Sequence, residues 1–445
     1  MMTERIEKAL LSATETKLFW LGESMLERVP EMFKALFPGC KACLVADGNT
    51  LAAAGREVYA ALRVQGVEVV KPFIFDKPPH IDLAAVEKVA AYLKEQDAIA
   101  IAVGAGSIND ICKVASFRLG RRYLCVATAA SVDGYASTGA PMTLDGFKKT
   151  VPCSAPLGIV ADLAVLQRAP YELTAAGYAD LVAKVPAGAD WLIADILGAG
   201  SEPILDVPWA MVQGPLEGWI NHPYELKNGE GSALSDLFEG LTLSGFAMQA
   251  AGSSRPASGC EHMFSHLWEM SGVKRQDGTE PSHGFKVAIG SLASIAAMES
   301  LFSEDFASSD IAEAVKRYPS WSEREGMIRK LFGDGIFGDK IVAESKAKYL
   351  EDDALLARLE KIAASWEDMK AKVERQIMSF VRMREMFRVA GCPIHPREIG
   401  VSSTRCAASA IAAQMIRSRY TVLDLAFDTG RLHAAVEAIG AAWEA

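Results

Sequence analysis

"AIAIAVGAGSINDICKVASFRLG", residues 98–120, changes its character in the middle. Its first half is an apolar run that breaks at Gly104 and Gly106, and its second half has apolar residues at helical spacing. We predict a strand over 98–106 that leads into a helix over 108–120. At the carboxyl edge of a parallel sheet, such glycines let a pyrophosphate approach the main chain, and the amides that open the helix point at the anion. The third glycine of the full dinucleotide pattern is missing, so the loop alone is a weak signal.

The segments on both sides of this stretch extend the alternation of strands and helices. Strands are expected at residues 41–47, 67–75 and 121–131, and helices at 50–66 and 82–96. Strands joined by helical crossovers form a parallel sheet with helices on both faces, as in Rossmann-like domains. After about residue 165 the apolar spacing becomes three and four, which is typical of helices. We therefore predict an α/β nucleotide-binding domain at 1–165, an all-α domain at 166–445, and a site in the cleft between them.

The composition excludes several classes of protein. The net charge is −10, from 46 basic and 56 acidic residues that are mixed along the chain. This argues against a general binder of nucleic acid or of membrane surfaces. We find no secretory leader and no apolar run long enough to span a bilayer, so we expect a cytoplasmic protein. Its eight cysteines, including the Cys40 and Cys43 pair, are expected to be reduced thiols.

Three histidines form a candidate metal site. His262 and His266 lie four residues apart in "GCEHMFSHLWEM" (259–270), and therefore on one face of the expected helix. His283 opens the next helix after a loop long enough to reverse the chain. A catalytic divalent metal commonly takes three protein ligands, and Asp180 or Glu261 could supply a carboxylate. The alternative interpretation is a pair of ordinary histidines satisfied by hydrogen bonds.

Asp47 ends the expected strand at 41–47 and begins "DGNT". There its carboxylate could accept a hydrogen bond from an adenosine ribose hydroxyl. An aspartate that only initiates an Asp-Gly turn has the same sequence pattern.

Taken together, four segments are more specific than any single motif. They are "VGAGSINDICK" (103–113), "VATAASVDGYAS" (126–137), "GYADLVAK" (177–184) and "SRPASGCEHMFSH" (254–266), the last followed by "HG" at 283–284. In this order and spacing they resemble the bacterial sn-glycerol-1-phosphate dehydrogenases, of the iron-containing alcohol dehydrogenase and dehydroquinate synthase-like superfamily. The resemblance runs from about Asp47 to residues 419–430.

The resemblance implies a role for individual residues. Asp180, His262 and His283 match metal ligands, His266 matches a neighbouring catalytic position, and Asp133 matches a catalytic aspartate that contacts the substrate. The cofactor positions that it implies are Asp47, Gly104, Ala105, Gly106, Ser107, Asp110, Thr128, Ser131 and Ser137. Independently, Lys148, Lys149 and Arg255 are candidates for a substrate phosphate, because a phosphate needs cationic donors.

Two departures from the family pattern stand out. Ala105 occupies the middle position of the usual glycine triple, and Phe285 and Lys286 stand where close relatives often have glutamate and glutamine. The second departure lies beside a predicted metal ligand, so it bears on the substrate more than on the cofactor.

The expected activity is the reversible reduction of dihydroxyacetone phosphate to sn-glycerol 1-phosphate, a step of phospholipid metabolism, with NAD(H) or NADP(H) and one Zn, Ni or Fe ion. Asp47 would repel a 2′-phosphate, which favours NAD. We expect a homo-oligomer whose partner is a small phosphorylated substrate, with no nucleic acid and no membrane. The alternatives are a cyclase of the dehydroquinate synthase type with tightly bound NAD, a glycerol or polyol dehydrogenase, and a non-catalytic metal- or nucleotide-binding protein.

Overall fold

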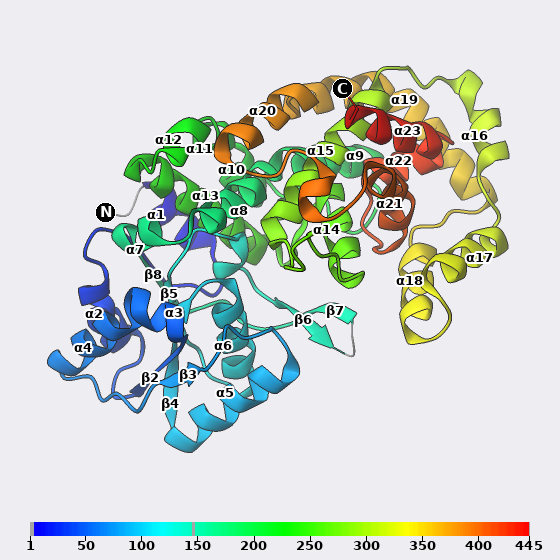
Figure 1. Cartoon of the computed structure of the whole chain (residues 1–445). Coiled ribbons are helices and arrows are strands. Elements are labelled where there is room, and N and C mark those ends of the chain that lie inside the picture. The colour runs from blue at the N-terminus through cyan, green and yellow to red at the C-terminus, as the bar shows by residue number, and fades with distance from the viewer. Residues whose placement is uncertain (1–3, 145–146, 445) are drawn as a thin grey trace. The chain divides into compact units, whose positions relative to one another are not determined.

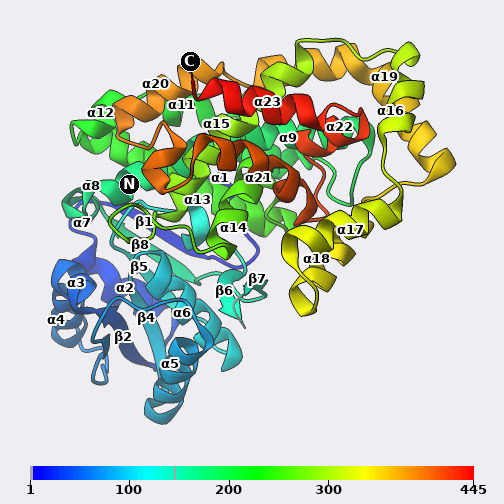
Figure 2. The same ribbon diagram turned by 45° about the vertical axis from the view of Figure 1, so that its right-hand side comes forward.

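The computed structural model describes residues 4–144 and 147–444, in two compact units. Unit 1 consists of residues 1–181 and 206–254, and unit 2 of residues 182–205 and 255–445. Figure 1 labels the elements along the chain, and Figure 2 gives a second view. The predicted domain boundary after residue 165 stays a prediction; unit 1 also includes helices that follow it.

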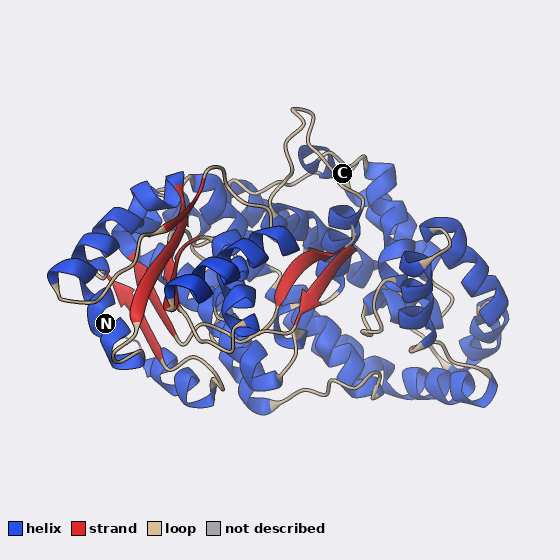
Figure 3. Cartoon of the chain, turned by 90° about the horizontal axis from the view of Figure 1, so that it is seen from below, coloured by secondary structure: helices blue, strands red, loops and turns tan. Residues whose placement is uncertain are grey.

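Among the described residues, all strands belong to unit 1. Figure 3 colours the strands red. They are β1 (Leu18–Gly22), β2 (Lys41–Asp47), β3 (Phe73–Phe75), β4 (Ala98–Gly104), β5 (Leu124–Ala127), β6 (Ala140–Leu144), β7 (Phe147–Val151) and β8 (Gly158–Asp162). Six of them form a parallel sheet in the order β1-β8-β5-β4-β2-β3, and β6 and β7 form an antiparallel pair. The predicted parallel sheet is confirmed.

The helices of unit 1 are α1 (Glu4–Ser12), α2 (Val29–Leu36), α3 (Gly48–Thr50), α4 (Arg56–Val64), α5 (Leu83–Gln96), α6 (Gly106–Arg118), α7 (Leu163–Arg168), α8 (Tyr171–Val182), α10 (Asp206–Gln213), α11 (Leu216–Ile220), α12 (Pro223–Lys227) and α13 (Gly231–Ala251). In Figures 1 and 2, α2 and α4 lie on one side of the sheet, and α5 and α6 on the other. The predicted helix at 82–96 is α5, which Asp82 caps by accepting a hydrogen bond from the Ala85 amide at 2.8 Å.

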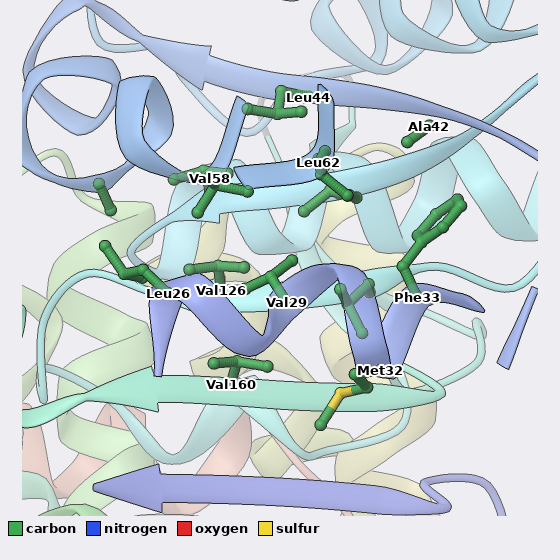
Figure 4. Packing of buried hydrophobic residues seen from close by; sticks show 14 of the residues in the cluster. Leu26, Val29, Met32, Phe33, Ala42, Leu44, Val58, Leu62, Val126 and Val160 are labelled. Atoms are coloured by element: carbon green, nitrogen blue, oxygen red, sulfur yellow. The ribbon is translucent and has the colours of Figure 1, made fainter. Parts of the chain in front are cut away.

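Apolar side chains from α2, α4 and the sheet form the core on the first face. Figure 4 shows Val29, Met32 and Phe33 of α2 beside Val126 and Val160 of the sheet. All five are buried, and burying one side chain of this size contributes about 1.5–3 kcal/mol. Strands buried on both faces carry continuous apolar runs, which is why "CLVA" and "AIAIAV" contain no polar residues.

Two strand predictions need correction. Residues 67–75 were expected to form one strand, but β3 covers only Phe73–Phe75, and Val69 makes an isolated bridge to Ala42. Pro72 interrupts the segment because proline has no N–H for the ladder. The strand expected at 121–131 is β5 alone, since residues from Thr128 onward form a loop.

Unit 2 is helical throughout, as expected after residue 165. Its helices are α9 (Lys184–Leu197), α14 (Cys260–Met270), α15 (His283–Phe302), α16 (Ile311–Arg317), α17 (Trp321–Phe332), α18 (Ile336–Lys346), α19 (Asp352–Gln376), α20 (Phe380–Ala390), α21 (Ser403–Met415), α22 (Val422–Asp428) and α23 (Leu432–Ala442). Helix α15 contacts α9, α14, α20, α22 and α23.

Helix α15 is long and apolar enough to cross a membrane by length and composition. However, 89% of the residues in its most apolar window are buried inside the protein. This apolarity is therefore explained by its place at the centre of unit 2.

Candidate active site

The order of the strands reverses within the parallel sheet of unit 1. From β2 the chain moves to β3 at one edge and then returns to β4 on the other side of β2. Open parallel sheets bind ligands beyond the carboxyl ends of the strands at such a reversal. Strands β2 and β4 both end two residues beyond the pair Val45–Ala102, at Asp47 and Gly104. Two of the predicted cofactor residues therefore lie at neighbouring strand ends.

The glycine loop connects β4 directly to α6. A Cβ on Gly104 would lie 2.5 Å from Cβ of Ile108, so only glycine lets the first turn of α6 fold back on the strand. Gly106 has more room, with Val132 Cγ2 at 3.4 Å from an added Cβ. Ala105 is the residue before the first helical position, and Ser107 follows within the first turn. The amides at this helix end are donors for an anion.

Thr128 lies beside the loop, because its amide donates to the Gly104 carbonyl at 3.2 Å. Ser131 and Ser137 are buried further along the same segment. The Ser137 hydroxyl donates to the Gly134 carbonyl at 3.2 Å, and Ser131 Oγ lies 3.5 Å from the Tyr135 hydroxyl. Their roles toward a nicotinamide stay predictions.

Asp47 caps a helix. Its Oδ1 accepts hydrogen bonds of 2.9 Å from the amides of Asn49 and Thr50, and Thr50 completes a capping box. The turn-initiating interpretation of this residue is thus realised in the fold. A ribose contact stays a prediction, and it is compatible with a cap that uses Oδ1 for both bonds.

Asp110 forms a buried ion pair with Lys113, at 3.2 Å between Oδ1 and Nζ. The same ammonium group donates to the carbonyls of Gly134 and Gly139, at 2.9 and 3.1 Å. Lys113 therefore ties α6 to the loop at residues 128–139. Asp110 is among the residues predicted from the sequence and Lys113 is not. The available signal for Lys113 is its spacing of three residues from an opposite charge within one helix.

Two glycines let helices approach this loop closely. A Cβ on Gly177 of α8 would overlap the Ala130 carbonyl oxygen, and a Cβ on Gly245 of α13 would lie 2.6 Å from Cβ of Ala136. Asp133 is held between the same helices: its amide donates to Asp180 Oδ2 at 3.0 Å, and the Ser244 hydroxyl donates to its Oδ2 at 3.1 Å. The fold of unit 1 thus brings the predicted substrate aspartate and the predicted metal aspartate together.

Unit 2 brings the three histidines together. The ring centroids of His262 and His283 are 5.3 Å apart, and His266 is 6.2 Å and 6.3 Å from them. His262 is buried, whereas the side chains of His266 and His283 are partly exposed, at 20% and 27%. Helices α14 and α15 thus place the three imidazoles side by side.

A glutamate carboxylate contacts the Nδ1 atom of each predicted imidazole ligand. Glu261 Oε1 lies 2.7 Å from His262 Nδ1, and Glu269 Oε1 lies 2.9 Å from His283 Nδ1. A carboxylate can only accept, so Nδ1 carries the hydrogen and the Nε2 lone pair is left for a metal. This pattern is common behind metal-bound histidines, so the two side chains fit a divalent ion.

Glu261 and Glu269 are therefore placed to orient the two imidazoles, and Glu269 is not among the residues predicted from the sequence. Its spacing of three residues from His266 and seven from His262 placed it on the same helix face, which was the available signal.

Arg255 was a candidate for the substrate phosphate, but it is buried and donates to the carbonyls of Asp190 and Tyr420, at 2.6 and 3.0 Å. Burial lowers the pKa of Arg255 to about 10 and raises that of the neighbouring Asp190 to about 7. These contacts indicate a structural role within unit 2. The side chains of Lys148 and Lys149, on β7, lie outside the described part of the structure.

Comparisons with known proteins identify relatives of this chain. Residues 20–170 match the family model "Iron-containing alcohol dehydrogenase". A glycerol-1-phosphate dehydrogenase (NAD(P)+) of Halalkalibacterium halodurans is 36% identical over 61% of this chain and 68% of the relative. One of Bacillus licheniformis is 30% identical over 73% of this chain and 82% of the relative. This chain spans 62% of the length of two further glycerol-1-phosphate dehydrogenases.

A probable glycerol dehydrogenase from Sinorhizobium meliloti has a similar structure, with a TM-score of 0.61, 15% identity, and coverage of 96% of this chain and 97% of that one. At this identity the likeness concerns the fold alone, which is that of the dehydroquinate synthase-like alcohol dehydrogenases. From the sequence relatives, we conclude that the chain belongs to the glycerol-1-phosphate dehydrogenases, a family of the iron-containing alcohol dehydrogenases.

Proposed function

We propose that this protein catalyses the reaction dihydroxyacetone phosphate + NAD(P)H + H⁺ ⇌ sn-glycerol 1-phosphate + NAD(P)⁺. Family membership supports the substrate and the cofactor, since the relatives are named for both. The main observation in support of a metal site is that Glu261 and Glu269 accept hydrogen bonds from Nδ1 of His262 and His283. Those bonds hold the imidazoles in the form that a metal requires.

We assign the metal to Asp180, His262 and His283, each of which offers one ligand atom. Asp180 and His262 are buried and His283 is partly exposed, so the ligands have restricted access to water. A bound Zn, Ni or Fe(II) ion would supply a Lewis acid for the reacting oxygen of the substrate. Glu261 remains the alternative carboxylate ligand, but its bonds to His262 and to the Gly259 amide favour the orienting role.

The dinucleotide is assigned to the ends of β2 and β4 in unit 1, with its pyrophosphate at the start of α6 and its adenosine ribose near Asp47. There the Gly104 carbonyl accepts a hydrogen bond from the Thr128 amide, and Gly106 is the first residue of α6. A carboxylate near the ribose repels a 2′-phosphate, so we expect NADH to be preferred over NADPH.

The substrate is assigned to Asp133 and His266. Asp133 accepts a hydrogen bond from Ser244, which fixes the direction of its carboxylate. Nδ1 of His266 lies 3.6 Å from Oε2 of Glu269. This contact orients the ring, so that it can position a substrate hydroxyl. Lys148 and Lys149 are the remaining candidates for the phosphate.

Localisation and assembly are further parts of the proposal. All eight cysteines are free thiols, which fits a reducing compartment such as the cytoplasm. We expect a homo-oligomer, and light scattering of the purified chain measures its state.

NADH oxidation with dihydroxyacetone phosphate, with and without a chelator, tests the function. We expect turnover that the chelator removes and chiral analysis that identifies sn-glycerol 1-phosphate. Equal turnover with dihydroxyacetone would indicate a polyol dehydrogenase instead. Absence of net NADH consumption with every keto-phosphate tested would contradict the proposal and favour a cyclase or a non-catalytic binder.

A further inference from the structure

Glu269 is a buried carboxylate that joins two histidines and a lysine. Its Oε1 lies 2.9 Å from His283 Nδ1 and 3.3 Å from Lys286 Nζ, and its Oε2 lies 3.6 Å from His266 Nδ1. The Glu269 side chain is 7% exposed and that of Lys286 is 9% exposed. One carboxylate oxygen is thus shared between a metal-facing imidazole and an ammonium group.

The two helices hold this arrangement in place. Lys286 lies three residues after His283 in α15, so both side chains project from the same face of that helix toward α14. Further along α15, a Cβ on Gly290 would overlap the Glu261 carbonyl oxygen of α14, so the helix main chains approach closely there. Close packing leaves the Glu269 side chain little freedom to turn away from its partners.

We propose that Glu269 and Lys286 form an opposed pair that sets how tightly His283 binds the metal. This inference rests on the proposed metal site. Glu269 is a positioning residue: it keeps the hydrogen of His283 on Nδ1 and makes Nε2 a stronger donor. Lys286 competes for the same oxygen and adds a positive charge, so it weakens the attraction of the site for a cation. The pair therefore tunes metal affinity in both directions.

The two halves of the pair have opposite predicted effects. With Glu269→Gln, the site loses a negative charge and the fixed tautomer of His283, so the affinity for Zn²⁺ falls about 10- to 100-fold. With Lys286→Met, the apolar stem is retained and the positive charge is lost, so Zn²⁺ binds more tightly, on the order of tenfold. A purely structural role would weaken binding in both variants, since both side chains are buried.

The experiment starts from metal-loaded protein that is stripped with a chelator and reloaded. Zn²⁺ dissociation constants are measured by competition with a chromophoric chelator for wild type, Glu269→Gln, Lys286→Met and the double variant. Visible absorption of the Co²⁺-loaded proteins reports the ligand field of the metal site. Lys372→Met, which removes an exposed ion pair with Asp368 of 2.8 Å, is the matched control and should leave both readouts unchanged.

Weaker binding in Glu269→Gln, tighter binding in Lys286→Met and an intermediate double variant support the proposal. Restoration of affinity by Glu269→Asp, relative to Glu269→Gln, supports it further. Unchanged or weaker binding in Lys286→Met overturns it, even if Glu269→Gln fails to fold. A wild-type protein that binds no Zn²⁺ and no Co²⁺ would instead refute the metal site, and with it the proposed function.

Discussion

The main-chain N–H of Asp133 donates a 3.0 Å hydrogen bond to the carboxylate of Asp180, although 47 residues separate the two in sequence. The first residue begins the short 3-10 turn Asp133–Tyr135, and the second lies near the end of α8. This bond makes the position of the predicted metal aspartate depend on the loop that the predicted substrate aspartate begins.

Asp180→Ala should remove both metal retention and turnover while leaving NADH binding intact, because the proposed nucleotide site lies at the ends of β2 and β4. Metal content after gel filtration and NADH fluorescence titration measure the two properties. Glu172→Gln, an exposed acid in the same helix, is the control. A variant that retains a stoichiometric metal and full activity would remove Asp180 from the ligand set.

Gly177→Ala should displace the loop at residues 128–137, since the added methyl group would overlap the Ala130 carbonyl. We expect a loss of stability of about 1–3 kcal/mol, as in other overpacked sites, and a raised KM for NADH. Calorimetry and steady-state kinetics check both. Gly326→Ala in α17, where nothing lies within 4 Å of an added Cβ, should raise stability by up to about 1 kcal/mol. Equal behaviour of the two variants would mean that the close approach of α8 to the loop carries no strain.

Lys113→Met should destabilise unit 1 by about 3–5 kcal/mol, because it leaves the buried Asp110 carboxylate without its cation. The double variant Asp110→Asn/Lys113→Met should recover part of that loss, since it removes the buried charge as well. NADH affinity should stay low in both variants, because the bonds to Gly134 and Gly139 are lost in each. Thermal unfolding and fluorescence titration separate these effects. Wild-type NADH affinity in the double variant would show that Lys113 does not support the loop at residues 128–139.

Asp428 predicts a pH dependence of stability in unit 2. Burial raises the pKa of Asp428 to about 7 from an ordinary value of 3.8, despite the hydrogen bond from Tyr420. Between these two values the folded protein binds more protons than the unfolded chain, so this group lowers stability as the pH rises from about 4 to about 7.

Asp428→Asn keeps an acceptor for the Tyr420 hydroxyl and removes the titration. Its melting temperature relative to wild type should therefore rise steadily between pH 4 and pH 7 and stay level above that range. Differential scanning calorimetry of both proteins across this range makes the comparison. A difference in melting temperature that is constant with pH would mean that Asp428 stays ionised throughout in the folded protein.

The local patterns of the chain were sufficient for much of this protein. The parallel α/β region, the helical remainder, the strand-to-helix turn at Gly104 and the shared face of His262 and His266 all follow from periodicity and glycine placement. Such features depend on residues a few positions apart, so the sequence records them directly. Strands β1 and β8 were missed, because "LFWLG" and "GIVAD" are too short to show a period.

Only the tertiary structure determined which distant segments of the chain are neighbours in space. The reversal of strand order between β2 and β4, the bond from Asp133 to Asp180 and the sharing of Glu269 by His283 and Lys286 join segments that are distant in the chain. The hydrogen bonds from Lys113 to the Gly134 and Gly139 carbonyls also exist only because the fold buries this side chain beside them. Partners of this kind are chosen by the packing of whole helices and strands, because burial forces each polar group to find whichever partner the fold brings near.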